Sequence, residues 1–144
     1  MSLEQIKATK GRILGVDFGE ARTGLAVSDA SRFLASGLGN IQGGGLEKTA
    51  QRILEAVQEH QAVAVVLGLP VNMNGTEGPR AERARELARL LEAHLPVYLM
   101  DERMTTMAAA RFLNETNTRG KKRKGVIDTL SAQIILQNAL DRLR

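Results

Sequence analysis

The chain of 144 residues is 43% hydrophobic and only 3% aromatic, carries a net charge of +4 and contains no cysteine. This composition fits one domain with an aliphatic core, and it excludes wholesale disorder, disulfide bonds and thiolate sites. The lack of cysteine leads us to expect a cytoplasmic location. We expect no membrane association, because no apolar run is long enough to span a bilayer and the first ten residues lack the apolar centre of a signal peptide.

The positive charge is concentrated in one short segment. Five of the 20 basic residues lie together, and without them basic and acidic residues nearly balance. They are Arg119, Lys121, Lys122, Arg123 and Lys124. A basic block of this kind indicates either contact with a polyanion such as nucleic acid or a solvated loop.

The first part of the chain predicts a hairpin of two strands. Residues 1–10 are expected to form a loose lead-in, and residues 11–144 a single domain. Residues 13–16 form a continuous apolar run typical of a strand buried on both faces, and residues 25–27 form a second run after a polar turn. Asp17 lies where the first strand ends, so we expect its carboxylate at an edge of the sheet.

The remaining segments alternate between continuous apolar runs and apolar residues at helical spacing. They predict strands over 33–41, 62–67 and 96–100, and helices over 46–60, from Pro79 onward, from Thr105 or Thr106 to about Asn114, and over 126–143. Gly37 and Gly39 indicate an edge position or a bulge for the third strand. A hairpin followed by alternating helices and strands predicts an α/β domain with a mixed five-stranded sheet and helices on both faces.

Two acidic residues follow strands that we expect to be parallel. Asp17 closes the first strand and Glu102 follows the last, whereas the strand between them ends at Gly68, which has no side chain to fill the gap. The carboxyl ends of parallel strands meet at one edge, where open α/β sheets place their sites. If the middle strand lies between the other two, the acids are about 10 Å apart at the backbone.

A third acidic residue, Asp128, lies on the last predicted helix. It shares a helical stripe with Ala132, Ile135 and Ala139, and this stripe should face protein. A carboxylate in such a position needs a partner. Arg22 or Arg103 could pair with it, or it could join Asp17 and Glu102 in binding a metal ion.

Three carboxylates from separate elements suit hard cations, which prefer oxygen ligands. Two such ions can activate a water molecule and stabilise the leaving oxygen of a phosphodiester. Asp17 also permits plainer interpretations: it can bond the backbone of its own turn, or form a phosphate-binding hairpin with Gly19 and Gly24.

Four motifs, taken together and in this order, are specific to one family. They are Leu14-Gly15-Val16-Asp17-Phe18-Gly19; Gly68-Leu69-Pro70 followed by Asn72-Met73-Asn74-Gly75-Thr76-Glu77; Asp101-Glu102-Arg103 with Thr105-Thr106; and Val126-Ile127-Asp128 with Ser131-Ala132. From about Gly11 onward the chain resembles the YqgF/RuvX family of bacterial Holliday junction resolvases. Members are also described as nucleases that process the small-subunit ribosomal RNA precursor.

The resemblance implies a ribonuclease-H-like fold and an endonuclease that hydrolyses phosphodiester bonds in structured nucleic acid with Mg²⁺ or Mn²⁺. It implies that Asp17, Glu102 and Asp128 are both catalytic residues and metal ligands. The substrate is expected to be precursor RNA or branched DNA. We expect nucleic acid to contact a mostly basic set of residues: Arg22, Asn72, Arg103, Lys121, Lys122, Arg123 and Lys124.

The resemblance leaves the number of metal ions open. RuvC-type resolvases, which are more distant relatives, use four acids, with two on the last helix one turn apart. Here Ser131 stands one turn after Asp128, so either one or two ions fit the sequence. The sequence does not determine the oligomeric state.

Two other functions fit parts of the sequence. One is a nucleotide-binding domain of the actin, sugar-kinase and chaperone-ATPase group, which shares the fold but clamps its nucleotide between two such domains. The other is a non-catalytic ribosome-maturation factor that binds RNA through the basic block. The RNA-binding factor needs the basic block but not the acids, so acid-to-alanine substitutions separate it from the nuclease.

Overall fold

The structure of the protein, a computed structural model, describes residues 2–104 and 121–144, with the backbone alone for residues 104 and 121–129. The helix predicted from Thr105 or Thr106 to about Asn114 lies outside the described residues, as does Arg119. The described elements are α1 (Leu3–Lys7), β1 (Arg12–Asp17), β2 (Arg22–Ser28), β3 (Ala35–Gln42), α2 (Leu46–His60), β4 (Ala62–Leu69), α3 (Pro79–Glu92), β5 (Val97–Asp101), the 3₁₀ turn η1 (Glu102–Met104) and α5 (Lys121–Leu143).

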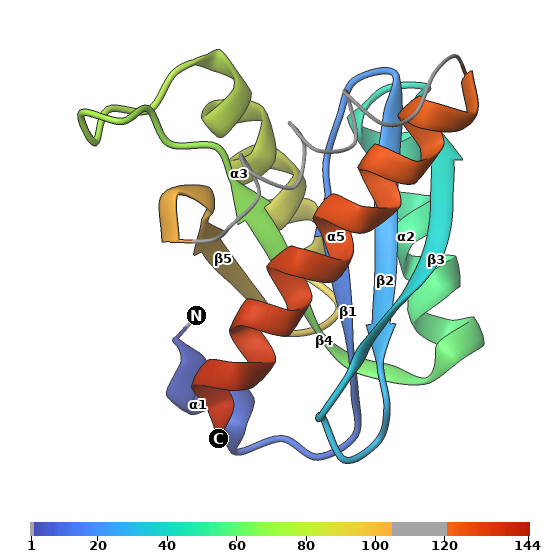
Figure 1. Ribbon diagram of the computed structural model, residues 1–144, viewed down its shortest axis with the longest axis vertical. Helices are drawn as coiled ribbons and strands as arrows, with labels where there is room; N and C mark the ends of the chain where they lie inside the picture. Colours follow the sequence, from blue (N-terminus) through green and yellow to red (C-terminus); the bar gives the residue numbers. More distant parts are fainter. Residues whose placement is uncertain (1, 105–120) are drawn as a thin grey trace.

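The strands form one sheet of five in the order β3-β2-β1-β4-β5 (Figure 1). The β1–β2 and β2–β3 pairs are antiparallel, whereas β4 pairs in parallel with both β1 and β5. The predicted mixed sheet is therefore confirmed, and β4 lies between the two strands that precede the acidic residues.

Strand β3 occupies one edge of the sheet and is bulged. Leu25 of β2 pairs with Gly39, but the next residue, Ala26, pairs with Gly37, so the intervening residue of β3 has no partner across the ladder. Gly39 adopts a φ of 92°, which residues with a side chain rarely tolerate. Both predictions for this strand, an edge position and a bulge, are confirmed.

Helices cover both faces of the sheet (Figure 1). One apolar cluster joins α2 and α3 to one face, and a second joins α5 and α1 to the other. The predicted helix from Pro79 onward is α3, and its buried residues recur at helical spacing: Ala81, Ala84, Leu87, Ala88 and Leu91. The predicted bounds of α2 also agree with the structure.

Helix α5 crosses its face of the sheet in very close contact with β1 and β4. A Cβ atom on Gly15 would lie 2.7 Å from the Cβ atom of Leu136 and 3.0 Å from the carbonyl oxygen of Ala132. A Cβ atom on Gly68 would lie 2.6 Å from Cδ1 of Ile135. Glycine at these two positions therefore allows the helix to lie directly on the strand backbones.

The N-terminal segment, expected to be a loose lead-in, instead forms helix α1. Ser2 and Gln5 make a capping box, and Ile6 is fully buried in the cluster below α5. Arg32 fixes the helix by donating hydrogen bonds to the carbonyl oxygen of Ile6 and to Oγ1 of Thr9. The segment is therefore an ordered part of the described domain.

The last helix begins earlier than predicted. It starts at Lys121 rather than Val126, so Lys121, Lys122, Arg123 and Lys124 belong to its first turns and not to a loop. None of the helices within residues 2–104 and 121–144 combines the length and the apolar character that a membrane span requires.

Gly15→Ala tests the helix–sheet contact. The new methyl group would meet a helix carbonyl as well as Leu136, so α5 must move away from β1. We expect the free energy of unfolding, measured with denaturant, to fall by about 1–3 kcal/mol. Gly78→Ala is the matched control, because its Cβ atom meets nothing closer than 3.9 Å, and it should lose less than about 1 kcal/mol. Equal losses in the two variants would contradict the contact.

Candidate active site at the carboxyl edge of the sheet

Asp17 and Gly68 lie on the same face of the sheet, the face that α5 covers. Side chains alternate between faces along a strand. Ile13 and Gly15 of β1 face α5, and so does the next alternate residue, Asp17. On β4 the same alternation places Gly68 on the α5 face, beside Met100 of β5.

Glu102 follows β5 in η1, and its carboxylate leans back over the end of β4. Its Oε1 atom lies 3.4 Å from the position that a Cβ atom on Gly68 would take. The side chain is half-buried. The Glu102 carboxylate, from the turn that follows β5, therefore occupies the space beside Gly68. A site between β1 and β5 requires a carboxylate in this position.

Asp17 is the last residue of β1 and is only 8% exposed. The parallel register sets its neighbour Val16 beside Leu67, which places Asp17 level with Gly68. Asp17 and Glu102 therefore lie on the same face and the same edge, with the side chain between them missing. Two strand spacings separate their backbones, about 10 Å.

Asp128 lies in α5, one helical turn before Ala132. The carbonyl oxygen of Ala132 lies 3.0 Å from the position that a Cβ atom on Gly15 would take, and Gly15 is two residues before Asp17. The side chain of Asp128 lies outside the described residues. Ser131, which stands one helical turn after Asp128, is buried at 1% exposure.

The donor set fits a hard divalent cation. Asp17 and Glu102 offer carboxylate oxygens, no histidine or cysteine stands among the predicted ligands, and Mg²⁺ and Mn²⁺ prefer such oxygens. Among the side chains that the structure describes, no three His, Cys, Asp or Glu residues form a metal-ligand group. Asp128, the third predicted ligand, lies in α5, where the structure describes its backbone alone.

Arg103 forms a tight ion pair beside the site. Its Nη2 atom lies 2.8 Å from Oδ2 of Asp101, and its backbone N–H donates to Oδ1 of the same carboxylate at 2.9 Å. These hydrogen bonds lower the pKa of Asp101 and raise the pKa of Arg103. Because the pKa of Asp101 is lowered on folding, the pair stabilises the fold at neutral pH and loses this effect as the pH falls through that pKa.

The same arginine reaches the loop between β4 and α3. Its Nη1 atom donates to the carbonyl of Met73 at 3.4 Å. Arg103, expected to contact nucleic acid and considered as a partner of Asp128, is thus bound to Asp101 and to this loop. Sequence analysis missed this role of Asp101, because the pairing depends on the chain turning into η1 directly after the strand.

The loop Val71–Gly78 is held by hydrogen bonds of its own. Asn72 and Thr76 are joined by backbone and side-chain bonds of 2.9 and 3.0 Å, and Oγ1 of Thr76 donates to Oδ1 of Asn74 at 2.6 Å. At its base, Arg85 of α3 donates hydrogen bonds to both carboxylate oxygens of Glu77, at 2.6 and 2.7 Å. Asn72, a predicted nucleic-acid contact, therefore shapes this loop.

A pocket of about 330 Å³ separates the loop from the acidic site. Its walls include Asn72, Arg80 and Glu102. Arg80 is exposed. The pocket is thus lined by a cation, Arg80, and by a carboxylate of the candidate site, Glu102. Arg22, another predicted contact, is the half-buried first residue of β2 and lies at the same end of the sheet as Asp17.

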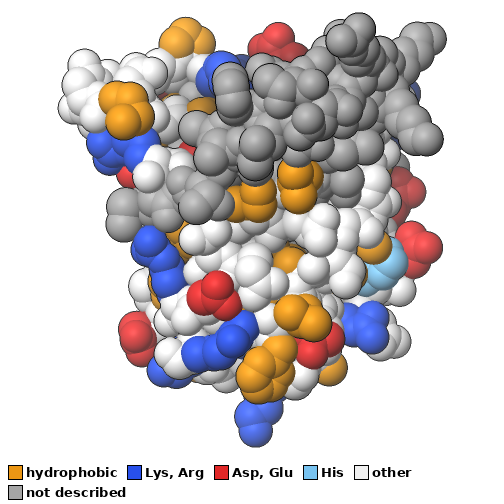
Figure 2. All heavy atoms as spheres, viewed as in Figure 1, with side chains coloured by type: hydrophobic (Ala, Val, Ile, Leu, Met, Phe, Trp, Pro, Cys, Tyr) orange, Lys and Arg blue, Asp and Glu red, His pale blue; other side chains and the backbone are white. Residues whose placement is uncertain are grey.

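The four basic residues at the start of α5 lie on the described backbone, but their side chains lie outside the described residues. On the face shown in Figure 2, the described acidic and basic side chains are interspersed. This part of the surface shows no extended patch of one sign.

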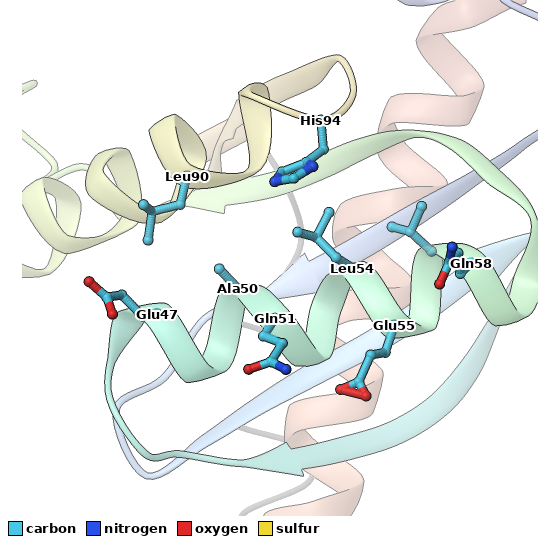
Figure 3. Close-up of a pocket in the computed structure, with 9 residues that line it drawn as sticks. Glu47, Ala50, Gln51, Leu54, Glu55, Gln58, Leu90 and His94 are labelled. Carbon is cyan, nitrogen blue, oxygen red and sulfur yellow. The ribbon is translucent and has the colours of Figure 1, made fainter.

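A second groove, of about 700 Å³, lies between α2 and α3 on the other side of the sheet (Figure 3). Leu90 and His94 lie across it from Ala50 and Leu54 of α2. None of the predicted site residues lines this groove. The candidate site is therefore the acidic edge on the other side of the sheet.

The fold and this edge define a class of proteins. The structure of Thermus thermophilus RuvC bound to a Holliday junction superposes with a TM-score of 0.58 at 16% identity, covering 92% of this chain and 94% of that chain. RuvC has a ribonuclease-H-like fold, and the predicted fold class is confirmed. Nucleases of this fold use divalent metal ions in general.

Sequence comparison gives the family. Residues 11–142 match the model of the RuvX family, described as Holliday junction resolvase. A relative from Ruminiclostridium cellulolyticum is 42% identical, covering 92% of this chain and 95% of the relative. Relatives from Paracoccus denitrificans and Lactiplantibacillus plantarum are each 48% identical, covering 93% and 91% of this chain and 86% and 94% of the relatives. All three are named "Putative pre-16S rRNA nuclease".

The chain belongs to the RuvX family, and it is a nuclease. The predicted resemblance is therefore confirmed, and the nuclease is favoured over the nucleotide-binding domain.

Gly68→Ala tests the gap between the two acids. The methyl group would press on Cδ1 of Ile135, the flexible end of a side chain, and would touch Oε1 of Glu102. We expect a smaller loss of stability than from Gly15→Ala. The cleavage rate should nevertheless fall by about tenfold or more, because small displacements of site groups are costly.

The double variant Gly68→Ala/Ile135→Val separates the two effects. It removes the Cδ1 atom, so stability should recover, whereas the contact with Glu102 and the low cleavage rate should remain. Recovery of full activity in the double variant would show that displacement of α5, and not of Glu102, caused the loss.

Proposed function

We propose that the protein is an endonuclease that hydrolyses phosphodiester bonds in structured nucleic acid with Mg²⁺ or Mn²⁺ held by Asp17, Glu102 and Asp128. The observation that carries this proposal is the placement of Asp17 and Glu102 on one face and one edge of the sheet, with Gly68 between them. Membership of a nuclease family supports it.

A divalent ion at this edge would activate water for attack and stabilise the charge that develops on phosphodiester oxygens. The protein supplies the rigid frame. Asp17 is fixed by a buried strand, and Glu102 by a turn braced through the neighbouring Asp101–Arg103 pair. Rigid carboxylates of this kind would hold the ion, and through it a bound phosphate, in reactive geometry without reorganisation during the reaction.

The candidate substrates are the small-subunit ribosomal RNA precursor and branched DNA. The curated relatives are named for the first, and the family description names the second. Either substrate would place the protein in the cytoplasm. The most direct comparison is cleavage of precursor RNA and of junction DNA by the same preparation, with and without Mg²⁺.

Asp17→Asn tests the metal site. The amide removes a negative charge from the proposed ligand set, so cleavage should fall by about 100-fold or more, since several kcal/mol of charge stabilisation are removed. Mg²⁺ should raise the melting temperature of the wild type by binding the folded state, and should raise that of the variant less.

The matched control is Asp141→Asn, which changes an exposed aspartate near the C-terminal end of α5. This variant should retain both cleavage and the thermal response to Mg²⁺. Undiminished cleavage by Asp17→Asn, with contaminating nuclease excluded, would refute the proposed site. RNA binding without cleavage by the wild type would instead identify the non-catalytic factor.

Replacing Lys121, Lys122, Arg123 and Lys124 with alanine tests the basic block. Positive charges oppose the dipole at a helix N-terminus, and the first turn of α5 contains no acidic residue. The variant should therefore be at least as stable as the wild type. Its affinity for all nucleic acids should fall, and the log–log salt dependence should flatten by roughly 0.7–0.9 for each phosphate that the protein no longer neutralises.

A control of equal charge replaces Lys48, Arg52, Arg83 and Arg89, which lie on α2 and α3 on the other side of the sheet. It should leave the salt dependence nearly unchanged. If the α5 variant binds with unchanged affinity and unchanged slope, the basic block is only solvated.

A further inference from the structure

The loop Val71–Gly78 carries a large apolar side chain into solvent. Met73 is 88% exposed, far more than most hydrophobic residues in the described part of the chain. A single exposed hydrophobic residue is usually unremarkable. Here, however, the surrounding loop is a projecting and strongly hydrogen-bonded structure beside the acidic site (Figure 1).

The loop keeps its shape through contacts at the tip and at the base. At the tip, the N–H of Gly75 donates to the carbonyl of Asn72 at 2.8 Å, and Gly75 adopts a φ of 89°. At the base, Val71 and Glu77 form a β-bridge, and Arg85 clamps Glu77. A loop held in this way loses little conformational freedom when it binds a partner.

The tip is also tied to the site. Arg103, which directly follows Glu102 in sequence, donates to the backbone carbonyl of Met73. The pocket of about 330 Å³ opens between the loop and Glu102. The apolar tip is thus bound to Arg103, the residue after Glu102, and Asn72, the residue before Met73, lines the pocket together with Glu102.

We propose that this loop is a preformed wedge, which inserts Met73 into the base stack of structured nucleic acid next to the cleaved bond. The inference rests on the proposed function. Apolar side chains such as methionine are used in this way to unstack a base step. The chain is poor in aromatic residues, so stacking against bases must rely on another kind of side chain. The pocket provides room for the displaced nucleotide beside Glu102.

Unstacking can be measured without cleavage. A duplex and a junction, each as RNA and as DNA, carry 2-aminopurine at the nucleotide that flanks the cleavage site, and Mg²⁺ is removed with chelator. Saturating wild-type protein should raise the fluorescence of the unstacked base several-fold. Met73→Gln, similar in length but polar, should bind but lose most of this rise, whereas Met73→Leu should keep it.

Leu34→Gln is the matched control. Leu34 is 68% exposed but precedes β3 at the opposite edge of the sheet, so this variant should behave as the wild type. No fluorescence rise with the wild type, or an equal rise with Met73→Gln at saturation, would overturn the proposal.

Cleavage gives a second readout. With Mg²⁺, Met73→Gln should cut fully paired substrates about tenfold more slowly than the wild type, and substrates with a bulged nucleotide at the cleaved bond equally fast, since the base there is already unstacked. Equal losses on both would overturn the wedge. Failure of the proposed active site would appear instead as normal cleavage by Asp17→Asn, and the fluorescence test would still decide whether the loop unstacks bases.

Discussion

The close approach of α5 to the sheet is the contact on which the rest of the structure depends. Gly15 and Gly68 have no side chains, so the helix lies directly on the backbones of β1 and β4 through Ala132 and Ile135. This contact closes the second apolar layer. Gly68 serves both the packing and the proposed site, because the space that accommodates Ile135 also borders the Glu102 carboxylate. Packing and proposed chemistry are therefore governed by the same missing side chain.

The carboxyl edge combines acidic residues with a rigid arrangement of ion pairs around them. Arg103 is held by Asp101, and Arg85 by Glu77, so these two arginines brace the edge and the neighbouring loop. The basic residues at the start of α5 do not stabilise the helix, because the helix dipole disfavours positive charge at its N-terminus. A stabilising sequence would carry acidic residues there. This placement supports a role in binding phosphates for the basic block.

The sequence was sufficient wherever a pattern was long and local. The helix Leu46–His60 and the inner face of α3 follow from helical spacing, and the parallel strands follow from continuous apolar runs. Helix α1 could not be predicted, because one buried residue shows no periodicity and its anchor, Arg32, lies 26 residues away from Ile6. The start of α5 was missed because a run of basic residues followed by glycine has no apolar pattern. At the site, alternation and strand order predicted where Asp17 and Glu102 lie, whereas the pairing of Arg103 depends on a turn that only the structure shows.

Carboxylates that bind a metal ion act on phosphate oxygens, which RNA and DNA share. The acidic edge therefore cannot by itself choose between a ribosomal RNA precursor and a DNA junction, and the 2′-hydroxyl that distinguishes them must be recognised elsewhere. Phosphate contacts by the basic block would position the strand without reading it. What remains is the shape of the substrate. A rigid apolar tip favours places where bases are easily unstacked, and both a folded RNA precursor and a branched DNA contain such places. In the proposed arrangement, selectivity thus arises from the loop between β4 and α3, while the acids supply chemistry common to both nucleic acids.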